Sequence, residues 1–245
     1  MYKLIVGITL TLVSLAMAWR SSSNSNSGLI DQLKQNGIIQ SAVVEEALKK
    51  VDRAQYVDSR NPYLDAPQLI GCDQTISAPH MHGIALETLR DVITIPNANL
   101  LDIGVGSGYL AACMARMNPS ARVYGIDIVP NLVEYALRNV RKQDKDLLEP
   151  NSLGGRLEIV VGDGWKSFDG IKFNGIHVGA AAETLPPQLL HQLAIGGKLI
   201  IPIGQQGEVQ TLIECTKLSD DLDFNKAYNI KTLLTVQYVP LVRDT

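Results

Sequence analysis

The chain has 245 residues, of which 46% are hydrophobic, and this is enough to bury one sizeable core and is typical of a single catalytic domain. Its formal net charge of -3 leaves no excess of lysine and arginine to neutralise a phosphate backbone, so nucleic acid is not an expected partner. The cysteines Cys72, Cys113 and Cys215 are widely spaced and odd in number, which excludes a disulfide framework and a Cys-x-x-Cys metal site.

The first 18 residues have the composition of a secretory signal. Lys3 precedes the apolar run 4–15, and Ala16-Met17-Ala18 supplies a small-x-small cleavage pattern. The run is shorter than the about 20 residues of a comfortable transmembrane helix, so a membrane anchor is the weaker interpretation. Against secretion, the rest of the chain contains no Asn-x-Ser/Thr glycosylation acceptor and no cysteine pairing pattern. The composition alone leaves the compartment open.

Residues 19–27 are a polar stretch rich in serine and asparagine, which we expect to be a linker or flexible arm before a folded domain over residues 28–245. Within that domain, apolar residues first recur with helical spacing over residues 29–33 and 43–51.

From Asn97 onward, apolar strand-like runs alternate with helical stretches. The predicted strands are residues 100–103, 123–126, 157–161, 176–178 and, after a turn at Gly196-Gly197, 198–203, with helices over about 108–117 and 131–142. This alternation predicts an α/β fold with a doubly wound, mostly parallel sheet that helices cover on both faces. Two further runs, 211–215 and 233–239, have little helix between them and predict a C-terminal antiparallel hairpin with residues 219–223 in its loop, which makes seven strands.

The densest functional pattern is a strand that starts at Leu100 and runs into a Gly-x-Gly-x-Gly turn at Gly104, Gly106 and Gly108. Such a turn needs residues without a Cβ so that the backbone can approach a ligand closely. Dinucleotide sites space their glycines as G-x-G-x-x-G, and here Tyr109 stands where the third glycine would be. The spacing therefore favours a cofactor without a pyrophosphate, such as S-adenosylmethionine, over NAD.

Three aspartates end or follow the first three predicted strands. Asp102 ends the first strand. Asp127 ends the second, at the position where a carboxylate can accept both ribose hydroxyl hydrogens, and Asp163 follows the third, where it could accept from an adenine amino group. A single aspartate at such a place is more often a helix cap or turn residue, but three at successive strand ends favour a nucleoside site.

Four further segments carry a family resemblance: residues 17–20, 61–68, 75–82 and 176–182. They are similar to the protein-L-isoaspartate (D-aspartate) O-methyltransferase family, and the Thr-Ile-Ser-Ala-Pro-His-Met-His segment that starts at Thr75 is the most specific of them. The similarity extends over essentially all of the chain from Met17 onward. It implies a Rossmann-like class I methyltransferase that moves a methyl group from S-adenosylmethionine to the free carboxyl of L-isoaspartyl and D-aspartyl residues in damaged proteins.

The resemblance also implies roles for individual residues. Ser77 corresponds to the active-site serine of the family. The implied cofactor contacts are Thr75, Ile76, Ser77, His82, Asp102, Gly104, Gly106, Ser107, Asp127, Ile128, Asp163 and Gly164. Two positions depart from the family: Ile128 stands where some relatives have a polar residue, and Val242 stands where relatives have a threonine near the cofactor. The C-terminal part of the site is therefore expected to be absent or differently built.

The implied reaction needs no strong general base, because a carboxyl with a pKa of about 3.9 is already ionised at neutral pH. His80 and His82 are two residues apart, but no third ligand is evident, so a metal is not expected. Three alternatives remain open: a methyltransferase for another carboxylate or a small molecule, a cofactor-binding interaction protein without turnover, and a hydride-transferring dehydrogenase.

The segment Met17-Ala18-Trp19-Arg20 resembles the place where cytosolic relatives begin, which would make residues 1–16 an upstream extension. We therefore expect a cytoplasmic enzyme that acts as a monomer on isoaspartyl peptides and proteins. Entry into the secretory pathway or membrane association through residues 1–18 is the alternative.

Overall fold

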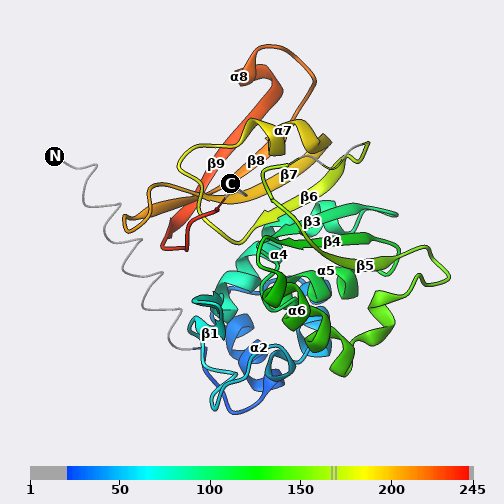
Figure 1. Ribbon diagram of the computed structural model, residues 1–245, viewed down its shortest axis with the longest axis vertical. Helices are drawn as coiled ribbons and strands as arrows, with labels where there is room; N and C mark the ends of the chain where they lie inside the picture. The colour runs from blue at the N-terminus through cyan, green and yellow to red at the C-terminus, as the bar shows by residue number, and fades with distance from the viewer. Residues whose placement is uncertain (1–20, 167, 169, 243–245) are drawn as a thin grey trace.

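The computed structural model describes residues 21–166, 168 and 170–242 of the chain. In this part of the chain, one seven-stranded sheet has the order β5-β4-β3-β6-β7-β8-β9 (Figure 1). Its strands are β3 (Asn99–Ile103), β4 (Arg122–Asp127), β5 (Arg156–Val161), β6 (Phe173–Val178), β7 (Leu193–Ile203), β8 (Gln210–Lys217) and β9 (Tyr228–Val236). Strands β3 to β7 pair in parallel, whereas β8 pairs antiparallel with both β7 and β9. The predicted α/β sheet with antiparallel C-terminal strands is confirmed.

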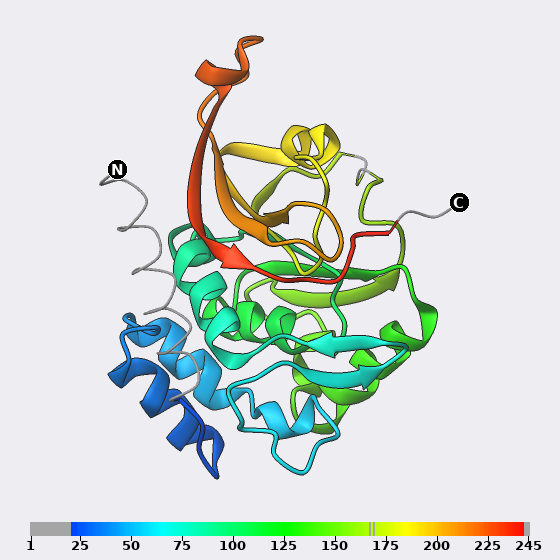
Figure 2. The same cartoon turned by 90° about the vertical axis from the view of Figure 1, so that its left-hand side faces the viewer.

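Helices precede and connect these strands. Among the described residues they are α2 (Asn26–Gln35), α3 (Ala42–Lys50), α4 (Pro79–Ile93), α5 (Tyr109–Met117), α6 (Pro130–Gln143), α7 (Pro187–Gln192) and α8 (Phe224–Ala227), with 3-10 turns at Arg53–Gln55 and Lys145–Leu148. A small antiparallel hairpin of β1 (Gln68–Gly71) and β2 (Gln74–Ile76) precedes α4. The β8–β9 hairpin, with α8 at its tip, projects from the body at the top of Figures 1 and 2.

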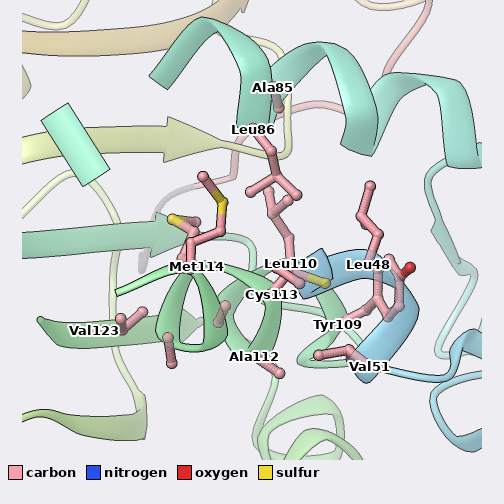
Figure 3. Packing of buried hydrophobic residues seen from close by; sticks show 14 of the residues in the cluster. Leu48, Val51, Ala85, Leu86, Tyr109, Leu110, Ala112, Cys113, Met114 and Val123 are labelled. Atoms are coloured by element: carbon pink, nitrogen blue, oxygen red, sulfur yellow. The ribbon is translucent and has the colours of Figure 1, made fainter. Parts of the chain in front are cut away.

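The hydrophobic core lies in two layers because successive side chains of a strand point to opposite faces of the sheet. Leu100 of β3 belongs to the core that α2 to α6 form on one face, and its neighbour Leu101 belongs to the core on the other face. Figure 3 shows part of the first core, where Leu86 of α4 reaches toward Leu110 and Met114 of α5. Full burial of a leucine of this kind stabilises the fold by about 1.5–3 kcal/mol.

The second face of the sheet is covered mainly by α7 and by aromatic side chains. Leu189 and Leu190 of α7 pack in its core, and Tyr124, Phe168 and Phe173 contact one another with ring centroids 5.6 to 5.9 Å apart. The expected helices on both faces are present, but the cover is uneven, since five helices contribute to the first core.

The strand boundaries differ from the predicted ones in the C-terminal half. Gly196-Gly197, expected as a turn before the strand, lies inside β7, which begins at Leu193. Gly196 adopts a φ of +80°, so the strand passes through an irregularity that its β6 pairing also records. Strand β9 begins at Tyr228, directly after α8. It ends at Val236, since the backbone N–H of Tyr238 donates to a side chain and not to a neighbouring strand.

The serine-rich tract before α2 is packed against the domain in its described part. Helix α2 begins at Asn26, inside the expected linker, and the Ser25 side chain caps it by accepting a backbone N–H. Ser21 is fully buried and accepts from the Asn36 side chain at 2.9 Å, while Ser22 accepts a backbone N–H at 3.0 Å. Residues 21–25 therefore contact the domain and are not a free arm.

The signal-like residues 1–18 lie outside the described residues, as do residues 19 and 20. Among the helices that the structure describes, none is both long and apolar enough to cross a membrane.

A buried polar network joins the N-terminal helices to α5 and α6. The Tyr56 hydroxyl donates to Asp144 Oδ2 at 2.7 Å, and Arg116 Nη2 donates to Asp144 Oδ1 at 2.7 Å. Burial and the neighbouring carboxylate raise the pKa of Tyr56 far above its ordinary value, so this hydroxyl stays protonated and remains a donor.

We predict that Tyr56→Phe lowers the free energy of unfolding by about 1–3 kcal/mol, because Asp144 Oδ2 then loses this donor inside the core. Urea denaturation of both proteins measures the difference. Asp146→Asn is the matched control, since Asp146 is exposed and its ion pair with Arg116 should contribute less than about 1 kcal/mol. A Tyr56→Phe variant as stable as the wild type would show that the hydrogen bond from Tyr56 to Asp144 does not stabilise the fold.

Candidate functional site

A cavity of about 550 Å³ opens at the carboxyl ends of the central strands. Strand β3 lies between β4 and β6, so the chain leaves it toward one side of the sheet and later returns to its other side. Open α/β sheets bind their ligands at such a switch point. The cavity wall includes Ile103 at the end of β3, Asp127 at the end of β4 and Gly179 just past β6.

The glycine turn forms the floor of this cavity. The N–H groups of Gly104 and Val105 both donate to Ile126 O, at 2.8 and 3.0 Å, which ties the turn to β4. Gly106 has a φ of +52°, and a Cβ on it would lie 3.2 Å from Ile70 of the β1–β2 hairpin. The positive φ and this close approach both favour glycine where the turn lies against the hairpin.

Asp127 connects the turn to the next helix. Its Oδ2 accepts the Gly106 N–H at 3.0 Å, and its Oδ1 accepts the Val129 N–H at 3.1 Å. Burial raises the pKa of Asp127 above its ordinary value, and the backbone N–H groups of Val129, Gly106 and Ile128 offset part of that shift. A carboxylate has about four lone-pair sites, so these backbone donors leave it able to accept a hydrogen bond from a ligand in the cavity.

Asp102 lies behind the turn and pairs with a histidine of the neighbouring strand. The parallel register sets Asp102 of β3 opposite His177 of β6, and His177 Nδ1 donates to Asp102 Oδ1 at 2.7 Å. Neither residue is among those that line the cavity. The direct contact of Asp102 is thus to His177, which fixes the two strands at the point where the glycine turn begins.

Ser77 lies between β2 and α4 and lines the cavity. Its carbonyl oxygen accepts a hydrogen bond from Arg53 Nη2 at 3.0 Å, and Arg53 Nε donates to Pro62 O at 3.0 Å. Burial lowers the pKa of Arg53 to about 10, which leaves it cationic at neutral pH. One buried guanidinium therefore joins the segment 61–68 to the segment that carries the serine.

Asp65 caps the helix that follows Ser77. Ala78 occupies the N-cap position of α4 but has no capping side chain, and Pro79 has no N–H to satisfy. Asp65 Oδ1 accepts both the backbone N–H of His80 at 3.0 Å and His80 Nδ1 at 2.8 Å. A carboxylate from another segment thus replaces the local cap and fixes the start of α4 next to the cavity.

His82 has a different environment from His80. It is buried, its ring contacts that of Tyr109 with centroids 4.9 Å apart, and its Nδ1 lies 3.4 Å from Arg53 Nη1. Burial first, and the Arg53 charge second, lower the pKa of His82, so it is neutral near pH 7. The two histidines have separate partners, and no group of three His, Cys, Asp or Glu side chains within the described residues is placed to hold a metal ion.

The structure brings seven of the twelve predicted cofactor residues to the cavity wall. These are Thr75, Ser77, Gly104, Gly106, Asp127, Ile128 and Gly164. The other five are buried and do not line it: Ile76, His82, Asp102, Ser107 and Asp163. Of these, Asp163 accepts the Trp165 N–H at 2.8 Å. This bond stabilises the turn that contains Gly164, which lines the cavity.

Two segments of the wall contain residues that were not predicted from the sequence, although Thr75 of β2 was predicted and Val242 was expected to depart from the family. The β1–β2 hairpin contributes Ile70 and Gln74, and the residues after β9 contribute Gln237 to Val242. Figure 2 shows this C-terminal segment, in red, running across the molecule from the end of β9. It is held by the loop after β6, because Ala181 N donates to Val239 O and Leu241 N donates to Ala181 O, both at 2.8 Å. The C-terminal part of the site is therefore present up to Val242.

Comparisons with known proteins identify the family of this chain. Residues 24–245 match the family described as Protein-L-isoaspartate(D-aspartate) O-methyltransferase (PCMT). The chain belongs to this family. A Caenorhabditis elegans protein-L-isoaspartate O-methyltransferase is 41% identical over 227 residues, which cover 92% of this chain and 96% of the relative. The corresponding Triticum aestivum protein is 37% identical over 231 residues, covering 93% and 96%.

A solved structure of the family shares the fold. A Plasmodium falciparum protein, named as a candidate protein-L-isoaspartate O-methyltransferase and crystallised with S-adenosyl-L-homocysteine, has a TM-score of 0.79 and 34% identity. The match covers 91% of this chain and all of the other.

We predict that Asp127→Ala weakens the binding of S-adenosyl-L-homocysteine by about 1.5 to 3 kcal/mol, because two charge-assisted hydrogen bonds to the ribose are lost. Isothermal titration calorimetry measures the dissociation constant. Glu134→Ala, a carboxylate on the exposed part of α6, is the control and should bind normally. An unchanged dissociation constant for Asp127→Ala would remove Asp127 from the site.

Proposed function

We propose that this chain is a protein repair methyltransferase that moves a methyl group from S-adenosylmethionine to the free carboxyl of L-isoaspartyl and D-aspartyl residues in damaged proteins. The observation that carries the proposal is that Ser77, from the most family-specific segment, lines the same cavity as the glycine turn and Asp127. The cofactor residues and a hydroxyl that can bind the acceptor thus line one cavity. Methyl transfer between two bound molecules requires such proximity.

The residues present fit the cofactor. The backbone of Gly104 and Gly106 suits its amino-acid end, and the Asp127 carboxylate suits the ribose hydroxyls. Ile128 and Gly164 line the part of the cavity where the adenine would lie. When bound, S-adenosylmethionine supplies an electrophilic methyl group on a sulfonium cation. The isoleucine at position 128 would change only a contact to the ribose or to the adenine edge.

The residues around the acceptor act by position rather than by proton transfer. An isoaspartyl carboxyl is ionised at neutral pH, so its oxygen attacks the methyl carbon directly while the carbon–sulfur bond breaks. Ser77 can donate a hydrogen bond that orients this carboxylate, and Arg53 holds the Ser77 backbone in place. Alignment of the reacting atoms at about 3 Å supplies several kcal/mol of the barrier. Apolar wall residues such as Met81 and Leu132 exclude water, which favours a step that neutralises charge.

We also propose that the native protein is a cytoplasmic monomer that starts at or just after Met17. The resemblance of residues 17–20 to the start of cytosolic relatives supports this start site. N-terminal sequencing of protein from fractionated cells tests it, together with sedimentation of the purified chain. A product that begins at Trp19 in the secretory fraction, or one that retains residues 1–16 in membranes, would refute the cytoplasmic assignment.

Transfer of labelled methyl groups to an isoaspartyl peptide and to its aspartyl twin tests the function. We expect a base-labile ester on the isoaspartyl peptide and at most trace labelling of the twin. Equal labelling would indicate a methyltransferase for another carboxylate, and binding of cofactor without labelling would indicate a protein that has lost turnover.

We predict that Ser77→Ala lowers kcat/KM for the isoaspartyl peptide by about 10- to 100-fold, the loss of one hydrogen bond to a charged group. The dissociation constant of S-adenosyl-L-homocysteine should change much less, because the proposed contact is to the acceptor. Ser219→Ala, in the exposed β8–β9 loop, is the matched control. Full activity of Ser77→Ala would rule out the proposed role.

A further inference from the structure

Tyr238 is a cavity residue that the proposed mechanism does not yet use. It follows β9 and lines the cavity together with Ser77, whose side chain interacts with its hydroxyl. The two residues are far apart in sequence and come from opposite ends of the catalytic domain. Burial raises the pKa of Tyr238 to about 12, so near neutral pH its hydroxyl is an uncharged donor.

The backbone of Tyr238 is held by a buried side chain. Gln210, at the start of β8, is fully buried, and its Oε1 accepts the Tyr238 N–H at 2.7 Å while its Nε2 donates to Tyr238 O at 3.1 Å. Both backbone polar groups of Tyr238 are thereby bound by one side-chain amide, in place of the strand pairing that ends at Val236. The next residues are fixed as well, since Val239 O and Leu241 N bind Ala181.

Ser77 is held from the other side of the cavity. Its carbonyl accepts from Arg53, and α4 starts two residues later with the cap that Asp65 provides. Two hydroxyl-bearing side chains therefore line one cavity, and each is attached to backbone that buried hydrogen bonds fix. A preorganised pair of this kind loses little conformational entropy when it binds a ligand.

We propose that the Ser77 and Tyr238 hydroxyls together bind the acceptor carboxylate, and that Gln210 is a positioning residue that sets the place of Tyr238. This inference rests on the proposed methyl transfer and deepens it by assigning a second carboxylate donor. A carboxylate that enters between them accepts from both, because each hydroxyl can turn its hydrogen toward the ligand.

The two donors also set the direction of attack. With both hydroxyls bound to one carboxylate oxygen, the second oxygen keeps its lone pairs for the methyl carbon. One carbon–oxygen bond forms as the carbon–sulfur bond breaks, its electron pair passes to sulfur, and the products are a neutral ester and a thioether. Both hydroxyl protons stay in place, so Tyr238 acts as a donor and not as a general acid or base.

Tyr238→Phe in the full chain tests the proposal, because it removes only the hydroxyl. We expect kcat/KM for an isoaspartyl peptide to fall by about 10- to 100-fold, as for loss of one hydrogen bond to a charged group, with the dissociation constant of S-adenosyl-L-homocysteine within about twofold of the wild type. Tyr228→Phe is the matched control, since the Tyr228 hydroxyl contacts Leu190 O and lies outside the cavity wall.

The double variant Ser77→Ala, Tyr238→Phe decides whether the two hydroxyls act on one group. Hydroxyls that share a carboxylate should be coupled, so the combined loss should differ from the product of the two single losses by at least about threefold. Losses that multiply would show separate roles and would overturn the shared-carboxylate assignment.

Gln210→Leu tests the positioning role. We expect it to lower kcat/KM for the peptide in wild-type background but to add little in the Tyr238→Phe background, because its effect passes through that hydroxyl. A purely structural role would lower activity equally in both backgrounds and would contradict the proposal. Should Gln210→Leu fail to fold, Tyr238→Phe still decides the main point.

Failure of the proposed function and failure of the inference about Tyr238 would give different results. A wild-type chain that binds S-adenosyl-L-homocysteine but labels no isoaspartyl peptide would overturn the proposed function. A wild-type chain that labels the peptide, with Tyr238→Phe as active as Tyr228→Phe, would overturn this inference alone.

Discussion

The site depends on the hydrogen bonds that the Asp127 carboxylate accepts from the backbone. This carboxylate accepts backbone N–H groups from Gly106 and Val129, and so it links the glycine turn after β3 to the start of α6. These bonds keep a buried carboxylate satisfied while leaving it able to accept from a ligand in the cavity. The same group therefore stabilises the loop and offers the ribose its partners, which explains why a buried charge is retained at this strand end.

The acceptor half of the cavity is built by long-range polar contacts rather than by one motif. Arg53 binds the carbonyl groups of Pro62 and Ser77, and Asp65 caps the helix that follows. On the opposite wall, Gln210 holds the backbone of Tyr238. Each of these side chains is buried, so a substitution that leaves its partners unsatisfied should disturb the position of a hydroxyl as well as the stability of the fold.

The parts of the fold that local sequence encodes were predictable. The strand ending at Ile103, the glycine turn and the aspartates at successive strand ends follow from short patterns, because parallel strands bring their carboxyl ends to one edge. The positions of the β1–β2 hairpin and of the segment with Tyr238 could not be predicted in this way. They depend on contacts of residues such as Ile70 and Gln210 with partners that are distant in sequence. The packed serines before α2 were missed for the same reason, since their polarity also suits a linker.

A crystal structure of the chain with S-adenosyl-L-homocysteine and an isoaspartyl peptide is the most direct measurement of whether one cavity holds both reactants. The account predicts both ribose hydroxyls on Asp127 and the isoaspartyl carboxylate between Ser77 and Tyr238, with its free oxygen turned toward the sulfur. A peptide carboxylate bound away from Ser77, or a nucleoside bound away from Asp127, would contradict it.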